Sequence, residues 1–525
     1  MEKINGRKLS LIFIFILILL VIALLVGKFT YSYLGPTISD DLETQGEVTA
    51  SGDTLIFTKG NNLSLSATTD NFTTGGTNLT STTNPKVKLV ASTKTNQASA
   101  TYYVGVLIKN NTYVYTTSGK TPELILTIKD EKGNNVSSGI DGLTYVTSGG
   151  VSGFDVTGKK GLFNIKIDYP ISTTSSSAGT THTWTFTLTF VNLGTDQSDN
   201  ENASMDLDIY LQKTKVPSTL ADVCTSGVNL ADCIVTLNDK STSSVSNIYY
   251  HDSTLANGAG DNSYRYAGAS DSVNNFVCFG SDAATCPTDN LYRIIGVIND
   301  KVKLIKYDYA TSTLLGTDGD YSGSDTPDTN YYKGSLTSIN TYYWNKTTNT
   351  STWSESNLNK INLNTNFINN IGMTWANKIV TTTWKVGGNT FDNIGSSVPS
   401  IAYQNEIVAP AENTIYDAKI GLMYASDYGF AASPSAWTTT LYNYDGNDAN
   451  GTSIETINWM HMGYEDLTIS RDSDDSSYVF YVEINAYMDS YGVSDGRGVR
   501  PSFSLETSVT YVSGDGTQNS PIRIN

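Results

Sequence analysis

Alternation of apolar and polar residues with a period of two dominates the first half of the chain. In the run 183–190, Trp, Phe and Leu occupy every second position and Thr occupies the others. The run 205–211 repeats this pattern, with Asp at polar positions. Successive side chains of a strand point to opposite faces, so these runs predict half-buried strands. With Gly-, Asn- and Ser-rich turns between them, they predict a mainly β chain with an antiparallel β-sandwich at 51–215.

One apolar run, Leu11 to Val26, follows three basic residues within the first eight positions. As a helix, the segment 10–29 would be about 30 Å long, which matches the hydrocarbon core of a bilayer. The basic flank predicts a cytoplasmic N-terminus and an extracellular body, held in the cell membrane by a single-pass transmembrane helix. A cleaved signal peptide is the alternative, although residues 26–30 contain no small-x-small cleavage pattern. Both interpretations export the rest of the chain.

We expect six segments along the chain. They are a cytoplasmic tip, a transmembrane anchor, a polar acidic stalk, the β-sandwich domain, a linker with a disulfide loop, and a C-terminal domain with a minor α+β content. Their predicted boundaries are 1–9, 10–29, 30–50, 51–215, 216–240 and 241–525.

The net charge of −18 and the four cysteines agree with an exported protein. Phosphate recognition needs clustered basic residues, so the acidic balance excludes nucleic acid as an expected partner. The cysteines form two pairs that are close in sequence, Cys224 with Cys233 and Cys278 with Cys286. We predict two short-range disulfides rather than a zinc site, because the chain has no Cys-x-x-Cys spacing and only three histidines.

Three further patterns lie in the C-terminal domain. Residues 293–298 and 302–306 read as a hairpin around a turn able to adopt positive φ at 299–301. Residues 353–367 predict a helix with Ser354 as its N-cap. Its predicted inward residues are Leu358, Ile361, Leu363 and Phe367. Residues 418–428 predict a strand that enters a short helix.

These patterns carry two resemblances. Four elements occur in a fixed order along the C-terminal domain. They are the hairpin beginning at Arg293, the segment Trp353 to Phe367, the motifs Ile420–Leu422 and Asp427–Tyr428, and the segment Gly498 to Phe503. Together they make residues 240–525 similar to the DUF6273-type domains of gut-bacterial surface proteins, which relate to the formylglycine-generating-enzyme branch of the C-type-lectin fold. The resemblance implies a C-type-lectin-like α+β fold whose last strands carry a ligand-facing surface. The anchor followed by a Thr-rich β-domain at 45–215 resembles the TasA/camelysin group, which implies a jelly-roll fold.

Enzymatic activity is not expected. The oxidase of the resembled fold works through a C-terminal cysteine pair, and no cysteine follows Cys286 here. His461 lies beside Trp and two Met, a setting more typical of a packed core residue than of a catalytic base. We expect Arg500 to bond a carboxylate or the backbone, and Pro501 to limit strand pairing.

Calcium is the one cofactor considered. The loops 317–325 and 444–448 place oxygen-bearing residues at alternate positions around Gly. Neither continues into a twelve-residue loop with a terminal Glu, so we interpret both as ordinary turns and predict no metal site.

The segment 477–491 is the predicted ligand-binding site. If residues 480–487 form one strand, Phe480, Val482, Ile484 and Ala486 share an inward face. Tyr rings with carboxylate and amide groups would then alternate on the solvent face, a composition suited to recognition. The predicted ligand-binding residues are Asp472, Asp474, Tyr478, Tyr481, Glu483, Asn485, Tyr487, Asp489 and Tyr491.

Two functions follow from these patterns. The favoured one is a membrane-anchored extracellular recognition or adhesion protein, whose distal domain binds a glycan or a protein. The alternative is a structural subunit of a TasA-like surface fibre or biofilm matrix.

Overall fold

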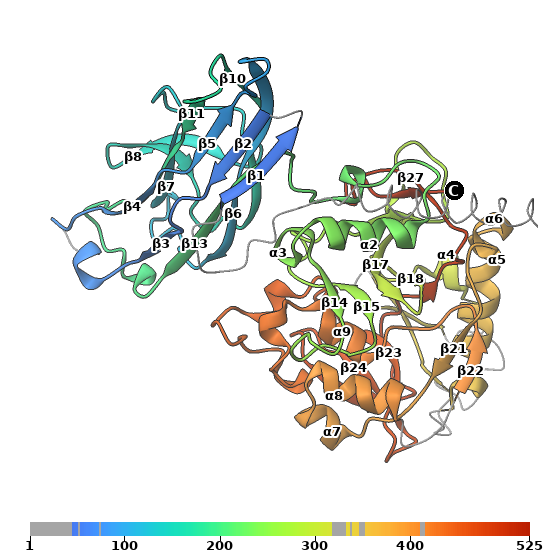
Figure 1. Ribbon diagram of the computed structural model, residues 1–525. Helices are drawn as coiled ribbons and strands as arrows, with labels where there is room; N and C mark the ends of the chain where they lie inside the picture. Colours follow the sequence, from blue (N-terminus) through green and yellow to red (C-terminus); the bar gives the residue numbers. More distant parts are fainter. Residues whose placement is uncertain are drawn as a thin grey trace, which may run out of the picture.

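The computed structural model describes residues 45–50, 53–72, 75–317, 332–336, 339–345, 352–409 and 415–525. The anchor predicted at 10–29 lies outside these ranges. Within them, no helix combines the length and the apolarity needed to cross a membrane. Two units with separate cores follow one another along the chain (Figure 1), and strands outnumber helices among their residues, which confirms the mainly β prediction.

The N-terminal unit contains three antiparallel sheets. The first has the order β1 (Gln45–Ala50), β2 (Asp53–Thr58), β5 (Lys86–Val90), β11 (Thr180–Thr183). The second is β10 (Gly161–Thr173), β6 (Ala98–Asn111), β13 (Ser204–Gln212), β3 (Leu63–Ser66). The third is β4 (Leu79–Thr83), β12 (Thr185–Phe190), β7 (Leu124–Lys129), β9 (Val151–Asp155), β8 (Thr144–Ser148). Short 3-10 turns η1 (Thr69–Asn71) and η2 (Ser198–Asn200) lie between strands.

Side chains from all three sheets form the core of this unit. The predicted alternation is confirmed along β12, where Phe186, Leu188 and Phe190 are fully buried. Trp184, just before the strand, is also buried, and its indole Nε1 donates to the Tyr102 hydroxyl at 2.9 Å. A large aromatic residue can be buried here because its one polar atom has a partner.

The segment 216–240 is not the linker that the sequence predicts. It forms the 3-10 turn η3 (Leu220–Asp222) and the helix α2 (Leu230–Lys240), which begins where the Asn229 side chain accepts from Ala231 N at 2.8 Å. The apolar face of α2 is buried in the core of the C-terminal unit. Helical spacing of three and four residues accounts for this, since it sets Leu230, Ile234 and Leu237 on one side.

Both predicted disulfides are present. Cys224 bonds Cys233 across a Cα separation of 5.5 Å, joining the segment that follows η3 to α2. Cys278 bonds Cys286 across 5.8 Å and closes the loop that follows strand β16 (Phe276–Cys278).

The central sheet of the C-terminal unit joins both of its ends. Its order is β14 (Ile248–His251), β15 (Ser263–Tyr266), β17 (Leu291–Ile298), β18 (Lys301–Lys306), β26 (Ser502–Ser504), with β16 paired to β17. The predicted hairpin is β17–β18, and its turn residues Asn299 and Asp300 have φ values of 50° and 59°. Because β26 pairs with β18, a strand near the C-terminal end of the unit is held against the β17–β18 hairpin.

Smaller elements surround this sheet. Its two- and three-stranded sheets are β19 (Tyr332–Leu336) with β20 (Ile339–Tyr342), β21 (Thr382–Lys385) with β22 (Ile415–Ala418), β23 (Asp466–Arg471) with β24 (Tyr478–Val482) and β25 (Met488–Gly492), and β27 (Tyr511–Ser513) with β28 (Arg523–Ile524). Besides α2, the α-helices described in the C-terminal unit are α3 (Ser243–Ser246), α4 (Ser312–Leu315), α5 (Ile368–Asn370), α6 (Met373–Ala376), α7 (Phe391–Ser396), α8 (Pro399–Tyr403) and α9 (Ala425–Ala431). Its other helical segments are η4 (Thr288–Asn290), η5 (Trp353–Glu355), η6 (Leu358–Phe367), η7 (Gln404–Val408), η8 (Pro434–Ala436), η9 (Leu441–Asn443) and η10 (Ile454–Ile457).

The helix predicted at 353–367 is mainly a π-helix. After the 3-10 turn η5, the π-helix η6 runs to Phe367, and Ser356 rather than Ser354 accepts from a backbone amide at its start. A π-helix has a wider turn than an α-helix, so its buried residues Leu358, Leu363 and Phe367 are spaced by five and four. The predicted inward residue Ile361 is only half-buried for the same reason.

Gly498 is required by close packing beside β23. A Cβ atom at this position would lie 2.6 Å from Tyr309 Cε1 and 2.9 Å from Glu465 O. We expect Gly498→Ala to lower the free energy of unfolding of the C-terminal unit by about 1–3 kcal/mol. Six of the seven Trp residues lie in this unit, so denaturant titration of the full chain followed by Trp fluorescence measures the change.

Gly395→Ala is the matched control. Gly395 lies in α7, and its added Cβ would meet no atom within 4 Å. This substitution is expected to leave stability unchanged or to raise it by up to about 1 kcal/mol. Equal effects of the two substitutions would contradict the packing argument.

Candidate recognition site

The strand predicted across 480–487 is interrupted by a turn. β24 ends at Val482 and β25 returns beside it. Glu483 N donates to Tyr487 O at 2.8 Å, and Ala486 N donates to Glu483 O at 3.0 Å. Ala486 has a φ of 76°, which is uncommon for residues other than Gly. The prediction of one continuous strand was wrong, because the alternation of residue types continues through a turn that only the backbone reveals.

The hairpin nevertheless brings five of the predicted residues to one face. Tyr481 lies opposite Asp489 in the register, and the hydrogen bond between Glu483 and Tyr487 continues this pairing. Tyr491 follows Asp489 by two residues, so its side chain points to the same side. We call this set the hairpin face: Tyr481, Glu483, Tyr487, Asp489 and Tyr491. The other side of the hairpin, including Phe480 and Met488, is buried in the core.

Tyr481 forms the floor of the hairpin face and not its surface. It is only 1 % exposed, and its hydroxyl donates to Glu483 Oε1 at 2.7 Å. Burial first, and then the hydrogen bond to Glu483 and the charge of that carboxylate, raise the pKa of its hydroxyl. The solvent-facing role predicted for Tyr481 is corrected here, because neighbouring side chains cover the ring.

Arg497 is one of these neighbours. Its guanidinium lies 5.0 Å from the ring centroid of Tyr481 and 4.6 Å from that of Tyr491, and its Nε lies 3.0 Å from Glu465 Oε2. The hairpin face therefore holds one cation against two Tyr rings. Sequence reasoning missed Arg497, which lies in the loop after β25 and has no place in the alternating pattern.

Two aromatic residues from other elements extend the hairpin face. Tyr442 of η9 is 43 % exposed, and its ring centroid lies 5.5 Å from that of Tyr487 in an edge-to-face arrangement. Phe391 of α7, also exposed, lies 6.2 Å from Tyr442. Both elements pack beside β25. No signal in the sequence connects these residues with the hairpin, from which they are separated by tens of positions.

Acidic groups surround Tyr487. Its pKa is raised by burial first and then by Glu483, Asp489, Tyr442 and Asp445. Burial and the nearby Glu483 also raise the pKa of Asp489. This end of the hairpin face therefore carries partly desolvated negative charge beside exposed aromatic rings.

The remaining predicted residues do not join the face. Asn485 is exposed at the tip of the turn, while Ile484, predicted to be inward, is 49 % exposed there. Tyr478 is exposed at the opposite end of the hairpin, where Asp472 and Asp474 form the β23–β24 turn. Asp472 is buried and accepts from Asp474 N at 3.0 Å, so this carboxylate stabilises the turn.

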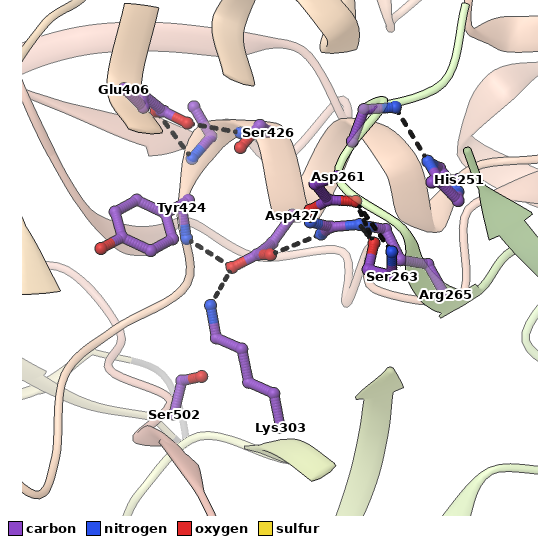
Figure 2. A network of polar contacts seen from close by, with 12 residues as sticks. His251, Asp261, Ser263, Arg265, Lys303, Glu406, Tyr424, Ser426, Asp427 and Ser502 are labelled. Atoms are coloured by element: carbon purple, nitrogen blue, oxygen red, sulfur yellow. Dashed lines mark hydrogen bonds and ion pairs between the residues drawn. The ribbon is translucent and has the colours of Figure 1, made fainter. Parts of the chain in front are cut away.

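A second cluster of charged residues lies inside the C-terminal unit (Figure 2). Asp427 of α9 accepts from Lys303 Nζ at 2.5 Å, from Arg265 Nη1 at 3.2 Å and from Tyr424 N at 3.0 Å. Arg265 also pairs with Asp261 at 2.9 Å. The side chains of Lys303, Arg265 and Asp427 are almost entirely buried. This arrangement ties β15, β18 and α9 together.

Two titratable groups flank this cluster. Glu406 is fully buried and accepts from Ser426 N at 3.1 Å and from the Ser470 hydroxyl, and burial raises its pKa to about 7. His251 is buried between the rings of Phe430 and Trp437, and burial lowers its pKa to about 3. Burial therefore keeps the Glu406 carboxyl neutral below about pH 7 and the His251 imidazole neutral above about pH 3.

Other predicted roles can be compared with the structure. Arg500 is buried and donates to Asp466 Oδ2 at 2.5 Å and to Met460 O at 2.7 Å, which confirms its structural role. The side chain of His461 is 4 % exposed, its ring bonds Ile484 O at 3.1 Å, and burial lowers its pKa, as expected for a packed residue.

The turn interpretation also holds for the loop 444–448. Its Asp448 carboxylate accepts from Asn450 N and Thr452 N. In the described part of the chain, no three His, Cys, Asp or Glu side chains are grouped as metal ligands. Most of the other loop considered for calcium, 317–325, lies outside the described residues.

Comparison of the chain with protein-family models, curated proteins and solved structures finds no match.

Glu406 is expected to make stability depend on pH. Its folded pKa of about 7 exceeds its ordinary value of 4.5, so its contribution is fully present below pH 4.5 and is lost as the pH rises through 7. The loss amounts to about 3 kcal/mol. Glu406→Gln keeps the side chain neutral and should remove this dependence. The measurement is the difference in unfolding free energy between the variant and the wild-type chain from pH 4.5 to 8.

Asp239→Asn is the control, because Asp239 is exposed on α2. It should leave the pH profile of the wild-type chain unchanged. His251 acts in the opposite direction, since its lowered pKa removes stability as the pH falls from 6.5 toward 3. His251 is present in both chains, so its effect cancels in the difference. A profile for Glu406→Gln parallel to that of the wild type would contradict the assignment.

Proposed function

We propose that this chain is a cell-surface recognition protein whose C-terminal unit binds a glycan or a protein ligand through the hairpin face. The observation that carries the proposal is the association of exposed Tyr491, half-exposed Tyr487 and neighbouring carboxylates on one side of β24–β25. Tyr491 is 46 % exposed, and Tyr487 lies beside Tyr442, Glu483 and Asp489. Tyr offers a large amphipathic surface at low entropic cost, and carboxylates accept hydrogen bonds from ligand hydroxyl or amide groups.

Rigid support for this surface favours recognition over an ordinary solvated strand. Phe480, Val482 and Met488 anchor the back of the hairpin in the core. Tyr481 and Arg497 fix the position of Tyr491 from below and beside it. A surface that is already ordered loses little conformational entropy when a ligand binds.

In this proposal the segment 10–29 anchors the chain in the membrane and the N-terminal unit holds the recognition unit away from it. The basic flank and apolar length of that segment support the topology. Two disulfides support an oxidising, extracellular location. The C-type-lectin-like and jelly-roll folds belong to the same proposal and rest on the resemblances described above.

Substitution of Tyr487 and Tyr491 tests the proposal. The full-length chain in non-ionic detergent is screened on glycan and surface-protein arrays, beside the Y487A and Y491A variants. Each substitution should weaken binding of a captured ligand by about 1–2 kcal/mol, or roughly tenfold, because it removes a central aromatic contact.

Tyr250→Ala is the matched control, since Tyr250 is a half-exposed tyrosine on the edge strand β14. It should bind as the wild type does. Binding profiles that are identical for all four proteins, with intact folds, would remove the hairpin face from the proposal. Ordered filaments of the purified chain in electron micrographs would instead favour the fibre subunit.

A further inference from the structure

The Tyr487 end of the hairpin face has the composition of a site for a cation. Three aromatic rings follow one another there, from Phe391 through Tyr442 to Tyr487. Glu483, Asp489 and Asp445 supply the charges that act on Tyr487. Aromatic faces and carboxylates both attract cations, and a site that combines them binds ammonium or guanidinium groups more strongly than either does alone.

The other end of the same face already holds such a group. The Arg497 guanidinium lies against Tyr481 and Tyr491 and pairs with Glu465. In the described part of the chain, no Lys or Arg is found over the rings of Tyr442 or Tyr487. The two ends therefore have similar aromatic and acidic groups, but among the described residues a cation lies against the rings at the Arg497 end alone.

The acidic groups also remain available to a ligand. Among the residues that the structure describes, the Asp489 carboxylate accepts a single hydrogen bond, from Ser490 N to Oδ1. Glu483 accepts from the Tyr481 hydroxyl and from Ile484 N, one on each oxygen. A cation placed between these carboxylates would relieve the mutual repulsion that burial strengthens.

We propose that the Tyr487 end of the hairpin face binds a Lys or Arg side chain of a protein partner, held by Tyr442 and Tyr487 and by the carboxylates of Glu483 and Asp489. This inference rests on the proposed recognition function and narrows its ligand to a basic protein segment. We choose a basic partner because its positive charge is complementary to the carboxylates of Glu483 and Asp489. A neutral glycan leaves the carboxylate charges uncompensated, and an anionic glycan is repelled by them.

Tetralysine is the probe, and the same peptide with acetylated side chains is its control, because acetylation removes the charge and keeps the backbone. Binding to the full-length chain in non-ionic detergent is measured by calorimetry at low and at physiological salt. The test variant is the double substitution E483Q/D489N. The Gln side chain at position 483 keeps one oxygen to accept from the Tyr481 hydroxyl, and the Asn side chain at position 489 can still accept from Ser490 N. The acceptor lost to Ile484 N lies at the exposed turn, where water can replace it, so this variant should fold normally.

The matched control is D199N/E201Q, which removes two exposed carboxylates from the N-terminal unit. We expect tetralysine to bind the wild type and this control equally, and E483Q/D489N at least tenfold more weakly. Tyr442→Ala should weaken binding similarly, and the acetylated peptide should not bind any of the proteins. Added salt should weaken the binding of tetralysine.

Three results would overturn the inference. Equal binding of tetralysine to both double variants would show that only the overall negative charge is sensed. Equal binding of the acetylated peptide would show that the charge is not recognised. The third result has two parts: the arrays identify a neutral glycan whose binding is abolished by Y487A, and tetralysine does not bind the wild type. That result would overturn the basic protein partner and leave the proposed recognition function standing.

Discussion

The C-terminal unit depends on the buried carboxylate of Asp427. It pairs with Lys303 from β18 and Arg265 from β15, which are separated from it by 124 and 162 positions in the chain. At 3 % exposure its charge has almost no contact with water, so both cations are needed to compensate for lost hydration. Tyr424 N bonds the same carboxylate, which fixes the start of α9 against the sheet. These two ion pairs of one carboxylate join segments from distant parts of the sequence.

The position of the hairpin face depends on the position of α9. The core that contains α9 also contains the inner side of β24–β25, and the Tyr428 hydroxyl of α9 donates to Ala486 O at 2.6 Å. This bond holds the turn in which Ala486 has a positive φ. The seven-residue helix α9 therefore carries both the buried ion pairs, through Asp427, and the hydrogen bond to the surface turn, through Tyr428.

Much of the fold could be predicted from local patterns. The alternation along β12, the β17–β18 hairpin with its turn, both disulfides and the structural role of Arg500 depend on neighbouring residues or on strong pairing chemistry. The predictions that were wrong involve longer-range competition. The segment 216–240 became part of a core because α2 buries an apolar face, and the helix after Trp353 took π spacing to bury its apolar residues.

The sequence alone indicated that Tyr481, Glu483 and Tyr487 lie on one face, because residue types alternate through this segment, although it predicted one strand where the chain forms a hairpin. It also determined a mainly β chain with two short disulfide loops. Only the tertiary structure decided that Tyr481 lies beneath that face and that Tyr442, Phe391 and Arg497 belong beside it. These residues come from separate elements, and their proximity results from packing against a common core, which no local pattern encodes.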